Sequence, residues 1–557
     1  MRRLPLILVL LAVTALAGPA AAATITIVNN DGANEGFNDP TPAAPIGGNP
    51  GTTIGAQRLF VFQTAANIWG SILPSNVQIR VNAQMNPQSC TATSGVLGSA
   101  GPTQVFRDFS GAIFPGTWYH VALANKLANV DLSPAQNDIG TTFNSSVGQP
   151  TCLTVGWYYG VDGNEGGQIE LLPVVLHELG HGLGFSTTTS GQTGTQSGGF
   201  PHVYDRFLYD NTQGLHWYQM NDAQRAASGQ NCSKLAWDGP NVVAAAPGFL
   251  GDKPLLRVNS PATVDGDYEV GLASFGPQNF NVTGNLILVN DGVGFVNNGC
   301  EAFVNAAQVN GNIALLDRGG CTFTQKVMNA QNAGAIGVVV ADSLPGCPPA
   351  GMGGANPSIT IPSVRTTQSD GTLIKTGLGT GVNVTMLFDS ALMAGSDAGG
   401  RVLVYTPVPY AGGSSVSHWD VSAEPSLLME PAITGGLSSS VDLTTAMFTD
   451  IGWMQGALSA DGPPANEKML GASFPNPAAG SSTIRFTMPR DETVSLGVYD
   501  ARGRLVNRLI DGPVPAGSHA VTWNGTDLGG RRVAAGAYFY RLEAAGAEES
   551  RQLVVVW

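Results

Sequence analysis

Residues 174–185 read VVLHELGHGLGF and contain one HExxH motif. Residues four apart lie on one face of an α-helix, so His177 and His181 can direct two imidazoles at a single zinc ion. Glu178 projects to the side, where it can hold a zinc-bound water and accept its proton. The apolar residues 172–176 favour burial of the helix, with the metal in the floor of a cleft. The motif therefore predicts a zinc hydrolase; the alternative is a core helix that contains two histidines by chance.

The length and the N-terminus predict an exported protein of several domains. The chain has 557 residues, too many for one core, and we expect three or four domains. Residues 1–23 are typical of a signal peptide: a basic start at Arg2-Arg3, an apolar run over 4–17, and small residues over 20–23. The apolar run is too short to cross a bilayer, and no later stretch qualifies as a transmembrane segment. We therefore expect a bacterial protein that is secreted or held at the cell surface rather than kept on an uncleaved anchor.

Charge and composition exclude one class of partner. The formal net charge is −14, with only 26 Lys and Arg residues and no basic cluster. Phosphate binding needs concentrated Lys and Arg, so nucleic acid is not an expected partner. The 73 glycines and the low charged fraction of 12% favour loop-rich β structure over long helices.

The chain has an even number of cysteines, which in an exported protein predicts disulfides. They are Cys90, Cys152, Cys232, Cys300, Cys321 and Cys347. They show no CxxC spacing, so a cysteine-bound zinc site is not expected. Cys300 and Cys321 lie close together in one later segment and are candidates to pair. The other pairings stay open.

Residues 24–257 mix predicted strands and helices and include the HExxH helix. Strands are predicted at 24–28 and 77–81, and a helix at 55–73. Residues 137–146 are predicted as an edge strand beside the cleft, and the part from Ile139 to Phe143 could pair with an extended substrate. The HExxH helix should begin within 168–172 and end at Gly182 or Gly184.

The tract 258–389 has a different pattern, typical of an inserted α/β domain. A strand and turn at 312–319, a helix at 323–333 and a buried strand at 335–341 form a β-α-β unit. Residues 311–323, the run KVMNAQNAGAIGVVVA at 326–341 and residues 359–364 together resemble a protease-associated (PA) domain. The resemblance implies a noncatalytic domain that binds substrate or restricts access, with a disulfide where Cys300 and Cys321 lie.

A linker at 458–468 precedes a C-terminal tract, 469–557, of short predicted strands. The strands are expected at 483–488, 494–500, 519–523 and 537–544. The runs SFPNP (473–477), VYDARG (498–503) and AGAYFYR (535–541) resemble the Ig-like C-terminal domains of exported bacterial proteins, of the hook-capping type and of the tails read by the type IX secretion system. The resemblance implies a β-sandwich and a secretion machinery as partner.

The third zinc ligand is not obvious, since a catalytic zinc site has three protein ligands and one open position. The compact pattern HExxHxxGxxH fits Gly184 but would place the last histidine at Thr187. A glutamate on a following helix is a second route, but the chain after His181 is loop-rich and its first glutamate is Glu269. A histidine beyond a long insertion is the third route. The histidines available for it are His202, His216 and His418.

His418 has the most informative surroundings. It lies in Ser417-His418-Trp419, which is followed by LLMEP at 427–431 and TAMFTDIGW at 445–453. This arrangement resembles the leishmanolysin branch of the metzincins, over residues 23–255 and 393–453. In that branch the third histidine follows a large insertion in a Ser-His-Trp context, and a methionine turn comes shortly after. The PA-like tract would account for most of the separation between His181 and His418.

The resemblance implies roles for five residues. His177, His181 and His418 would ligate Zn²⁺, Glu178 would be the general base, and Met429 would form the hydrophobic floor. Unlike that family, the chain shows no evident pro-segment with a cysteine switch.

Three polar residues after the HExxH helix are candidates for contact with substrate or a structural Ca²⁺ ion, although a structural role in a loop is the simpler interpretation. They are Tyr204, Asp205 and Asp210.

The sequence thus predicts a multidomain α+β protein: a metzincin-like protease domain, 24–257 and 390–457, interrupted by the insert and followed by the Ig-like domain. The predicted function is a secreted zinc endopeptidase acting on proteins or peptides. A surface adhesin on a degenerate protease scaffold is one alternative, although the intact Glu178 argues against it. A zinc hydrolase of non-peptide substrates is another.

Overall fold

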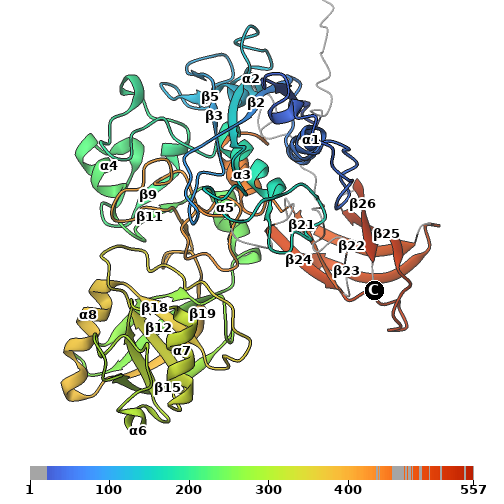
Figure 1. The fold of residues 1–557 in the computed structure, drawn as a ribbon. Coiled ribbons are helices and arrows are strands. Elements are labelled where there is room, and N and C mark those ends of the chain that lie inside the picture. Colours follow the sequence, from blue (N-terminus) through green and yellow to red (C-terminus); the bar gives the residue numbers. More distant parts are fainter. Residues whose placement is uncertain are drawn as a thin grey trace, which may run out of the picture. The chain divides into compact units, whose positions relative to one another are not determined.

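The computed structural model forms two compact units, Met1–Leu458 and Ser459–Trp557 (Figure 1). It describes residues 22–433, 437, 440–454, 470, 473, 478, 481–488, 492–500, 502–514, 517–544 and 547–555. Residues 1–21 of the predicted signal peptide and the predicted linker lie outside these ranges, as do most residues of the SFPNP run. Among the described residues, no helix is both long and apolar enough to span a membrane.

A four-stranded sheet organises the N-terminal half of the first unit. Its strands, in the order β1-β2-β6-β3, are Ile25–Asn29, Ile79–Asn86, Ile139–Asn144 and Gly98–Pro102. β1, β2 and β6 are parallel, and β3 pairs antiparallel with β6. The prediction that 137–146 is an edge strand is therefore wrong: β6 lies between β2 and β3, and β3 is the edge. Its mostly buried side chains belong to a strand with neighbours on both sides.

Two helices cover one face of this sheet (Figure 1). α1, Ile54–Ile72, begins where the Thr53 side chain accepts the N–H of Ala56. α3, Leu171–Leu183, carries the HExxH motif and is buried along its whole length. The helix is capped at its C-terminal end by Gly184, whose φ of +138° is a backbone conformation that glycine adopts much more readily than other residues. The predicted start and end of this helix are therefore confirmed. Indole N–H groups of Trp69 and Trp453 donate to carbonyls of α3, at Leu176 and Leu183.

A second sheet joins the parts of the first unit that lie before and after the insert. Its strands, in the order β10-β9-β11-β20, are Leu215–His216, Leu208–Asp210, Leu235–Trp237 and Val402–Leu403. β20 follows the insert and pairs antiparallel with β11, which precedes it. Two helices, α5 (Pro240–Ala245) and α9 (Thr444–Ile451), pack together nearby. The second half of the chain thereby returns to the core that contains α3.

The insert is built on one eight-stranded sheet, in the order β13-β12-β19-β15-β16-β17-β18-β14. The strands β12 and β19, Asp252–Ser260 and Asn383–Met393, open and close it and pair with each other. The predicted β-α-β unit is present as β16 (Ile313–Asp317), α7 (Phe323–Asn332) and β17 (Gly337–Ala341). Alternate residues of β17 pack on α7 and on α8, Gln368–Thr376, so the two helices cover opposite faces of the sheet.

The remaining strands of the insert are β13 (Gly266–Glu269), β14 (Gly271–Leu272), β15 (Asn281–Leu288) and β18 (Ser363–Thr366). Shorter elements elsewhere in the first unit are β4 (Val105–Phe106), β5 (Tyr119–His120), α2 (Val121–Ala128), β7 (Trp157–Tyr158), β8 (Ile169–Glu170) and α4 (Asp222–Ser228).

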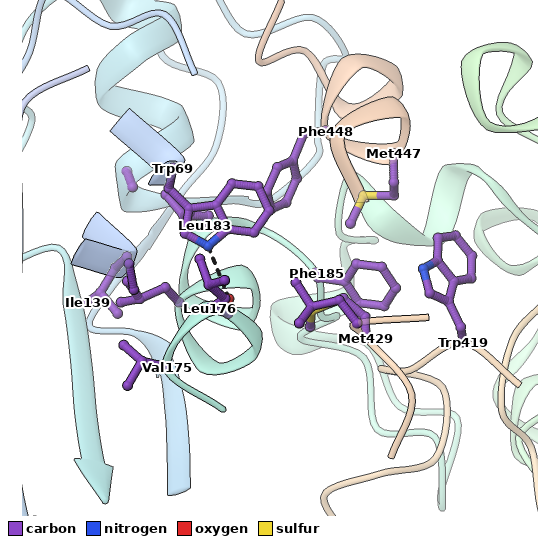
Figure 2. Packing of buried hydrophobic residues seen from close by; sticks show 14 of the residues in the cluster. Trp69, Ile139, Val175, Leu176, Leu183, Phe185, Trp419, Met429, Met447 and Phe448 are labelled. Atoms are coloured by element: carbon purple, nitrogen blue, oxygen red, sulfur yellow. Dashed lines mark hydrogen bonds between the residues drawn. The ribbon is translucent and has the colours of Figure 1, made fainter. Parts of the chain in front are cut away.

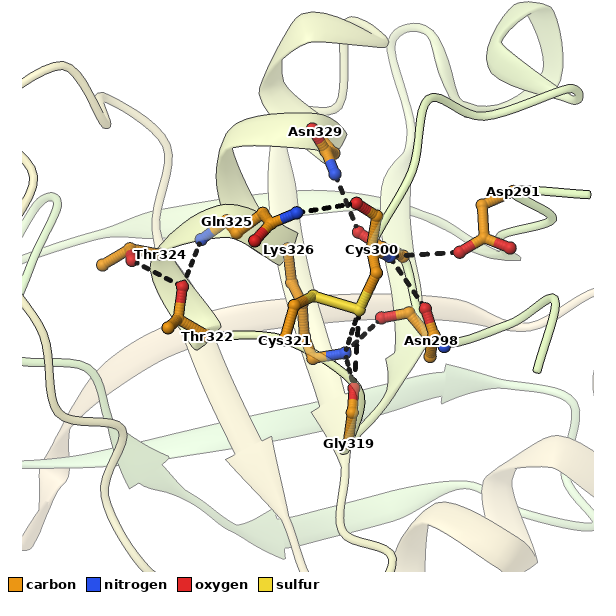
Figure 3. The surroundings of a disulfide bond; sticks show 11 residues. Asp291, Asn298, Cys300, Gly319, Cys321, Thr322, Thr324, Gln325, Lys326 and Asn329 are labelled. Carbon is orange, nitrogen blue, oxygen red and sulfur yellow. Dashed lines mark hydrogen bonds between the residues drawn. A yellow bond between two sulfur atoms is a disulfide. The ribbon is translucent and has the colours of Figure 1, made fainter. Parts of the chain in front are cut away.

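All six cysteines are paired. Cys90 bonds Cys152, Cys232 bonds Cys347, and Cys300 bonds Cys321, so the candidate pairing of the last two is confirmed. Figure 3 shows the Cys300–Cys321 bridge beside the buried Lys326, whose ammonium group donates to the carbonyls of Asn298 and Gly319. Cys232–Cys347 joins the insert to the segment that precedes it.

The second unit is a β structure with its own core. One sheet has the order β23-β22-β25-β26, and β21 pairs with β24 in a second sheet. The strands from β21 to β26 are Ser482–Met488, Glu492–Asp500, Leu505–Val514, Gly517–Trp523, Gly536–Ala544 and Ala547–Val555. The four strands expected here are all present.

Candidate metal centre

Three buried histidines converge in the core of the first unit. The Nε2 atom of His177 lies 3.1 Å from that of His181 and 3.2 Å from that of His418, and the last two are 3.2 Å apart. His177 and His181 come from successive turns of α3, while His418 comes from the segment that follows β20. Among the described residues, these three form the one group of His, Cys, Asp or Glu side chains close enough to hold a metal ion together.

Backbone carbonyls orient all three imidazoles. Nδ1 of His177 lies 2.7 Å from the Leu428 carbonyl, Nδ1 of His181 lies 2.8 Å from that of Phe185, and Nδ1 of His418 lies 2.8 Å from that of Ser414. Each Nδ1–H can donate only in the tautomer that leaves Nε2 as a lone pair. Three lone pairs facing one another at this distance repel unless a cation lies between them.

The protonation states of the three histidines are also those that metal binding requires. Burial lowers the pKa of His177 to about 3 and that of His181 to about 4, and it holds the pKa of His418 well below its usual range. All three are therefore neutral near pH 7, which is the form that binds metal. A zinc ion about 2.0–2.1 Å from each Nε2 is compatible with the observed triangle.

Glu178 lies beside the histidines, between α3 and the edge strand β3. It is 8% exposed, and burial raises the pKa of its carboxyl to about 8, against the effect of a hydrogen bond from the Ala100 backbone. A side chain at Gly98 would come within 3.1 Å of its Cγ, so the close approach of β3 requires glycine there. A nearby cation would lower this pKa and favour the carboxylate.

Met429 packs beneath the helix that carries the two motif histidines. It is fully buried, near Phe185 and Trp419 (Figure 2). A methyl group at Gly180 would lie 2.8 Å from its sulfur, so the helix and the methionine are in direct contact. The residue before it, Leu428, supplies the carbonyl that orients His177. Met429 therefore packs directly against the turn of α3 that carries the motif histidines.

The segment around His418 continues the second sheet. The His418 carbonyl accepts the N–H of Tyr405 at 2.9 Å, and the N–H of Asp420 donates to Leu403 at 2.9 Å. The N–H of Trp419 donates to the Met429 carbonyl at 2.8 Å. One continuous hydrogen-bonded network thus connects β20, His418 and the segment that contains Met429.

The other two candidate histidines lie elsewhere. His202 is buried with its ring 4.7 Å from that of His120, and His216 binds Asp238 at 2.6 Å near the surface. His120, which precedes the motif helix in the chain, has its Nε2 atom 3.4 Å from the Ser186 hydroxyl. No local sequence signal could pair His120 with His202, because a β-bridge between Trp118 and His202 brings their segments together.

The carboxylates of Asp205 and Asp210 accept hydrogen bonds from the loops around them. Asp205 is fully buried and accepts hydrogen bonds from the hydroxyls of Thr187 and Thr189 and from the His202 N–H. Asp210 accepts the N–H groups of Thr212 and Gln213. Tyr204 is buried against Phe185 and Trp237, and its hydroxyl has no hydrogen-bond partner among the described residues. Thr187 stands where the compact pattern HExxHxxGxxH has its last histidine, and its hydroxyl donates to the Asp205 carboxylate.

A hollow of about 380 Å³ beside β3 does not belong to the metal centre. It is lined by residues 99–103 with Gly140 and Thr142. Ser99 and Thr142 are cross-strand partners and point to one side of the sheet. Gly98 and Phe143, the next pair, face the other side, where Glu178 lies. The hollow therefore opens on the outer face of the sheet.

Known families and proteins match parts of the chain. The family "PA domain" matches residues 273–374, and the family "FlgD Ig-like domain" matches residues 474–548. The chain is 32% identical to vacuolar-sorting receptor 2 of Arabidopsis thaliana over 154 residues, which is 25% of each protein. It is 30% identical to leucine aminopeptidase 2 of Trichophyton rubrum over 121 residues, 22% of this chain and 23% of that protein.

The chain thus spans about a quarter of the length of these curated relatives. A solved zinc aminopeptidase from Bacillus subtilis is 20% identical, with a TM-score of 0.19, over 26% of this chain and 35% of that one. The insert and the C-terminal unit accordingly match the two kinds of domain that their sequences resemble.

Proposed function

We propose that this chain is an exported zinc endopeptidase of the leishmanolysin-like branch of the metzincins. The observation that carries the proposal is the convergence of His177, His181 and His418 on one point, with Glu178 beside them. Three neutral imidazoles are the protein donor set of a catalytic zinc site with one open position, and the adjacent carboxylate can activate a water in that position. The similarity of part of the chain to leucine aminopeptidase 2 supports a peptidase in general.

Zinc, when bound, would polarise the scissile carbonyl and lower the pKa of a coordinated water toward neutrality. Glu178 would accept the proton of the attacking water and deliver it to the leaving amine. Its carboxyl is shielded from bulk water, so it can hold that proton between the two steps. Met429 and the carbonyls on the three Nδ1 atoms would keep the imidazoles in position.

The edge strand β3 supports an extended peptide as substrate. Leu97 and Thr103 form their backbone hydrogen bonds toward β6 and its neighbouring residues, so the alternate residues Gly98, Ala100 and Pro102 turn their backbone groups to the free edge. The Ala100 backbone on that edge is close enough to Glu178 to lower the pKa of its carboxyl, against the larger effect of burial. A peptide paired with β3 would pass beside Glu178 and continue in both directions, which favours internal cleavage.

We further propose that residues 1–23 direct export and are removed. The match of residues 474–548 to "FlgD Ig-like domain" is compatible with a sorting role for the C-terminal unit, and a secretion machinery would then be its partner. N-terminal sequencing of protein recovered from the culture medium tests the first point: a start near residue 24 is expected, and an intact Met1 would contradict it.

Zymography on casein tests the activity, with the wild type compared with Glu178→Ala and with the chelated protein. The wild type should clear casein, and both controls should fail while Glu178→Ala still binds one zinc. Peptides blocked at both ends separate the modes of cleavage, because an endopeptidase cuts them and an aminopeptidase cannot. A zinc-loaded Glu178→Ala protein with normal turnover would refute the mechanism. A wild type that binds zinc but cleaves no peptide would favour the adhesin or a different substrate.

A further inference from the structure

We propose that the insert holds the third zinc ligand in place, through the Cys232–Cys347 disulfide and the backbone pairing beside it. The inference rests on the proposed metal centre and adds positioning residues to it. In this view the insert is part of the machinery that orders His418. This differs from a passenger domain attached at a surface loop, whose removal would leave the host core intact.

Three segments meet at this disulfide. Cys347 belongs to the insert, and Cys232 belongs to the segment between α4 and β11. Cys347 also exchanges two backbone hydrogen bonds with Val408: the Val408 N–H donates to Cys347 at 3.1 Å, and the Cys347 N–H donates back at 3.4 Å. Two residues earlier, the Thr406 hydroxyl donates to the Asn231 carbonyl at 3.0 Å, next to Cys232.

The segment that receives these contacts is the one that carries His418. Residues 405–418 form a loop closed at its base, where the N–H of Tyr405 donates to the His418 carbonyl and that of Val416 donates to Tyr405. Ser414 within this loop supplies the carbonyl that orients the His418 ring. A displacement of the loop would therefore move both the ligand and the group that sets its tautomer.

The loop also contains a strained residue. Val416 has a φ of +71° and is 1% exposed. A β-branched side chain rarely adopts this backbone conformation, which persists only where the surroundings enforce it. It lies two residues before His418. The hydrogen bonds of Val408 and Thr406 restrain the loop, and such restraint is what this backbone conformation requires.

The residues that flank the insert are bonded to each other, and one of them is bonded to the same stretch of chain. The Gly251 N–H donates to the Glu424 carbonyl at 2.7 Å, and the Ala394 N–H donates to Gly251 at 2.9 Å. Glu424 lies between His418 and Met429 in the chain. The insert thus contacts the ligand-bearing stretch before His418, at Val408, and the residue that leads into the insert, Gly251, contacts it after His418, at Glu424.

The chain offers a matched control disulfide. Cys300–Cys321 closes a loop inside the insert, and its neighbours Asn298, Gly319 and Lys326 all belong to the insert (Figure 3). Loss of this bridge should disturb the insert without releasing residues 405–418. A general effect of removing a disulfide can therefore be separated from a specific effect on the third ligand.

The experiment compares the full-length wild type with Cys232→Ser/Cys347→Ser and with Cys300→Ser/Cys321→Ser. Zinc affinity is measured by competition with a chelator, and ligand geometry by the visible spectrum of the Co²⁺-loaded protein. Hydrogen–deuterium exchange is followed over residues 405–418. We expect the first variant to bind zinc about 10- to 100-fold more weakly, with an altered cobalt spectrum and faster exchange in that loop. The second variant should match the wild type in all three.

A milder variant covers the case in which the first one does not fold. Thr406→Val keeps every cysteine and the shape of the side chain and removes only the hydrogen bond to Asn231. It should raise exchange over residues 405–418 and weaken zinc binding in the same direction. Wild-type zinc affinity and exchange in both Thr406→Val and the Cys232/Cys347 variant would overturn the inference. A wild type that binds no zinc would instead overturn the proposed function, while the exchange data would still decide whether the insert orders the loop.

Discussion

Gly180 and Met429 are in contact beside the three converging histidines: a Cβ at Gly180 would lie 2.8 Å from the sulfur of Met429 and 3.2 Å from its methyl carbon. The glycine stands between Glu178 and His181, on the turn that carries both motif histidines. Its missing side chain is what allows the methionine turn to approach the helix. The close packing of Met429 against the motif helix therefore depends on a small residue that plays no part in the chemistry.

Gly180→Ala should destabilise the protein although alanine is the better helix former. Helix propensity alone would favour alanine by about 1 kcal/mol. The added methyl group would force Met429 out of a packed site, and overpacking of this kind costs about 1–3 kcal/mol. We expect a net loss of about 1 kcal/mol in chemical denaturation, together with weaker zinc binding. A Gly180→Ala protein more stable than the wild type would show that the Met429 side chain can move away from the helix at little cost in free energy.

The same substitution should reverse its sign once the methionine is gone. In a Met429→Ala background the space beneath the helix is open, so Gly180→Ala should regain its propensity advantage of about 1 kcal/mol. The two single variants and the double variant form a double-mutant cycle, measured by denaturant unfolding. Additive effects would mean that Gly180 and Met429 do not interact.

The HExxH helix and the insert were predictable from the sequence because the residue patterns that specify them are local. The HExxH spacing, the apolar run before it and Gly184 after it determine α3, and the β-α-β pattern determines β16, α7 and β17. The place of a strand in a sheet is not local. The edge strand predicted at 137–146 lies inside the sheet, because the local pattern cannot reveal that β3, earlier in the chain, pairs with its free side.

Contacts between residues that are far apart in the sequence could not be predicted either. His120 and His202 meet through a β-bridge between segments more than eighty residues apart, and the pairing of Cys232 with Cys347 depends on where the insert folds back. Six cysteines can form three disulfides in about 15 ways, and the spacing of the cysteines favoured only the pair Cys300–Cys321. The convergence of His418 with the motif histidines was expected only because a family pattern linked the two distant segments.

Zinc should stabilise the folded protein, and the effect should depend on His418 and not on His202. A ligand at a hundred times its Kd adds about 2.7 kcal/mol to the free energy of unfolding. Thermal unfolding with and without zinc should show this gain in the wild type and in His202→Ala, measured against the metal-free form of each protein. His418→Ala should lose most of it. An equal zinc response in His418→Ala would remove His418 from the metal centre.

Glu430 should make the metal-free protein less stable as the pH rises. Burial raises the pKa of its carboxyl from 4.5 to about 8, and the neighbouring Asp420 and Asp442 add to this. The folded state therefore keeps a proton that the unfolded state has lost between these two values. The stabilising contribution is complete below pH 4.5 and is lost as the pH rises to about 8.

Glu430→Gln removes this dependence while its amide oxygen can still accept the Leu427 N–H. The variant should gain stability over the wild type across that pH range, by a few kcal/mol at about pH 8 in order of magnitude. Urea unfolding in the presence of a chelator measures the difference. A difference between the two proteins that does not change from pH 4.5 to pH 8 would mean that Glu430 ionises freely in the folded state.

Asp450 should be one of the most sensitive positions outside the metal centre. It lies on α9 and is 7% exposed, and its carboxylate accepts hydrogen bonds from the Trp237 indole at 2.9 Å and from the N–H groups of Asn241 at 2.9 Å and Val242 at 3.2 Å. It thus caps the first turn of α5 from another helix and connects the segments before and after the insert.

Asp450→Asn should destabilise the protein almost as much as Asp450→Ala, by about 2–3 kcal/mol, because the amide NH₂ would face donors that need an acceptor. Asp238→Asn is the matched control: its partner His216 lies near the surface, where such ion pairs contribute about 0–1 kcal/mol. Denaturant unfolding of the three variants decides the point. If Asp450→Asn were as stable as the wild type, the carboxylate would not be needed to join α9 to α5, and the two parts of the first unit would have to be held together by β11, β20 and their apolar core alone.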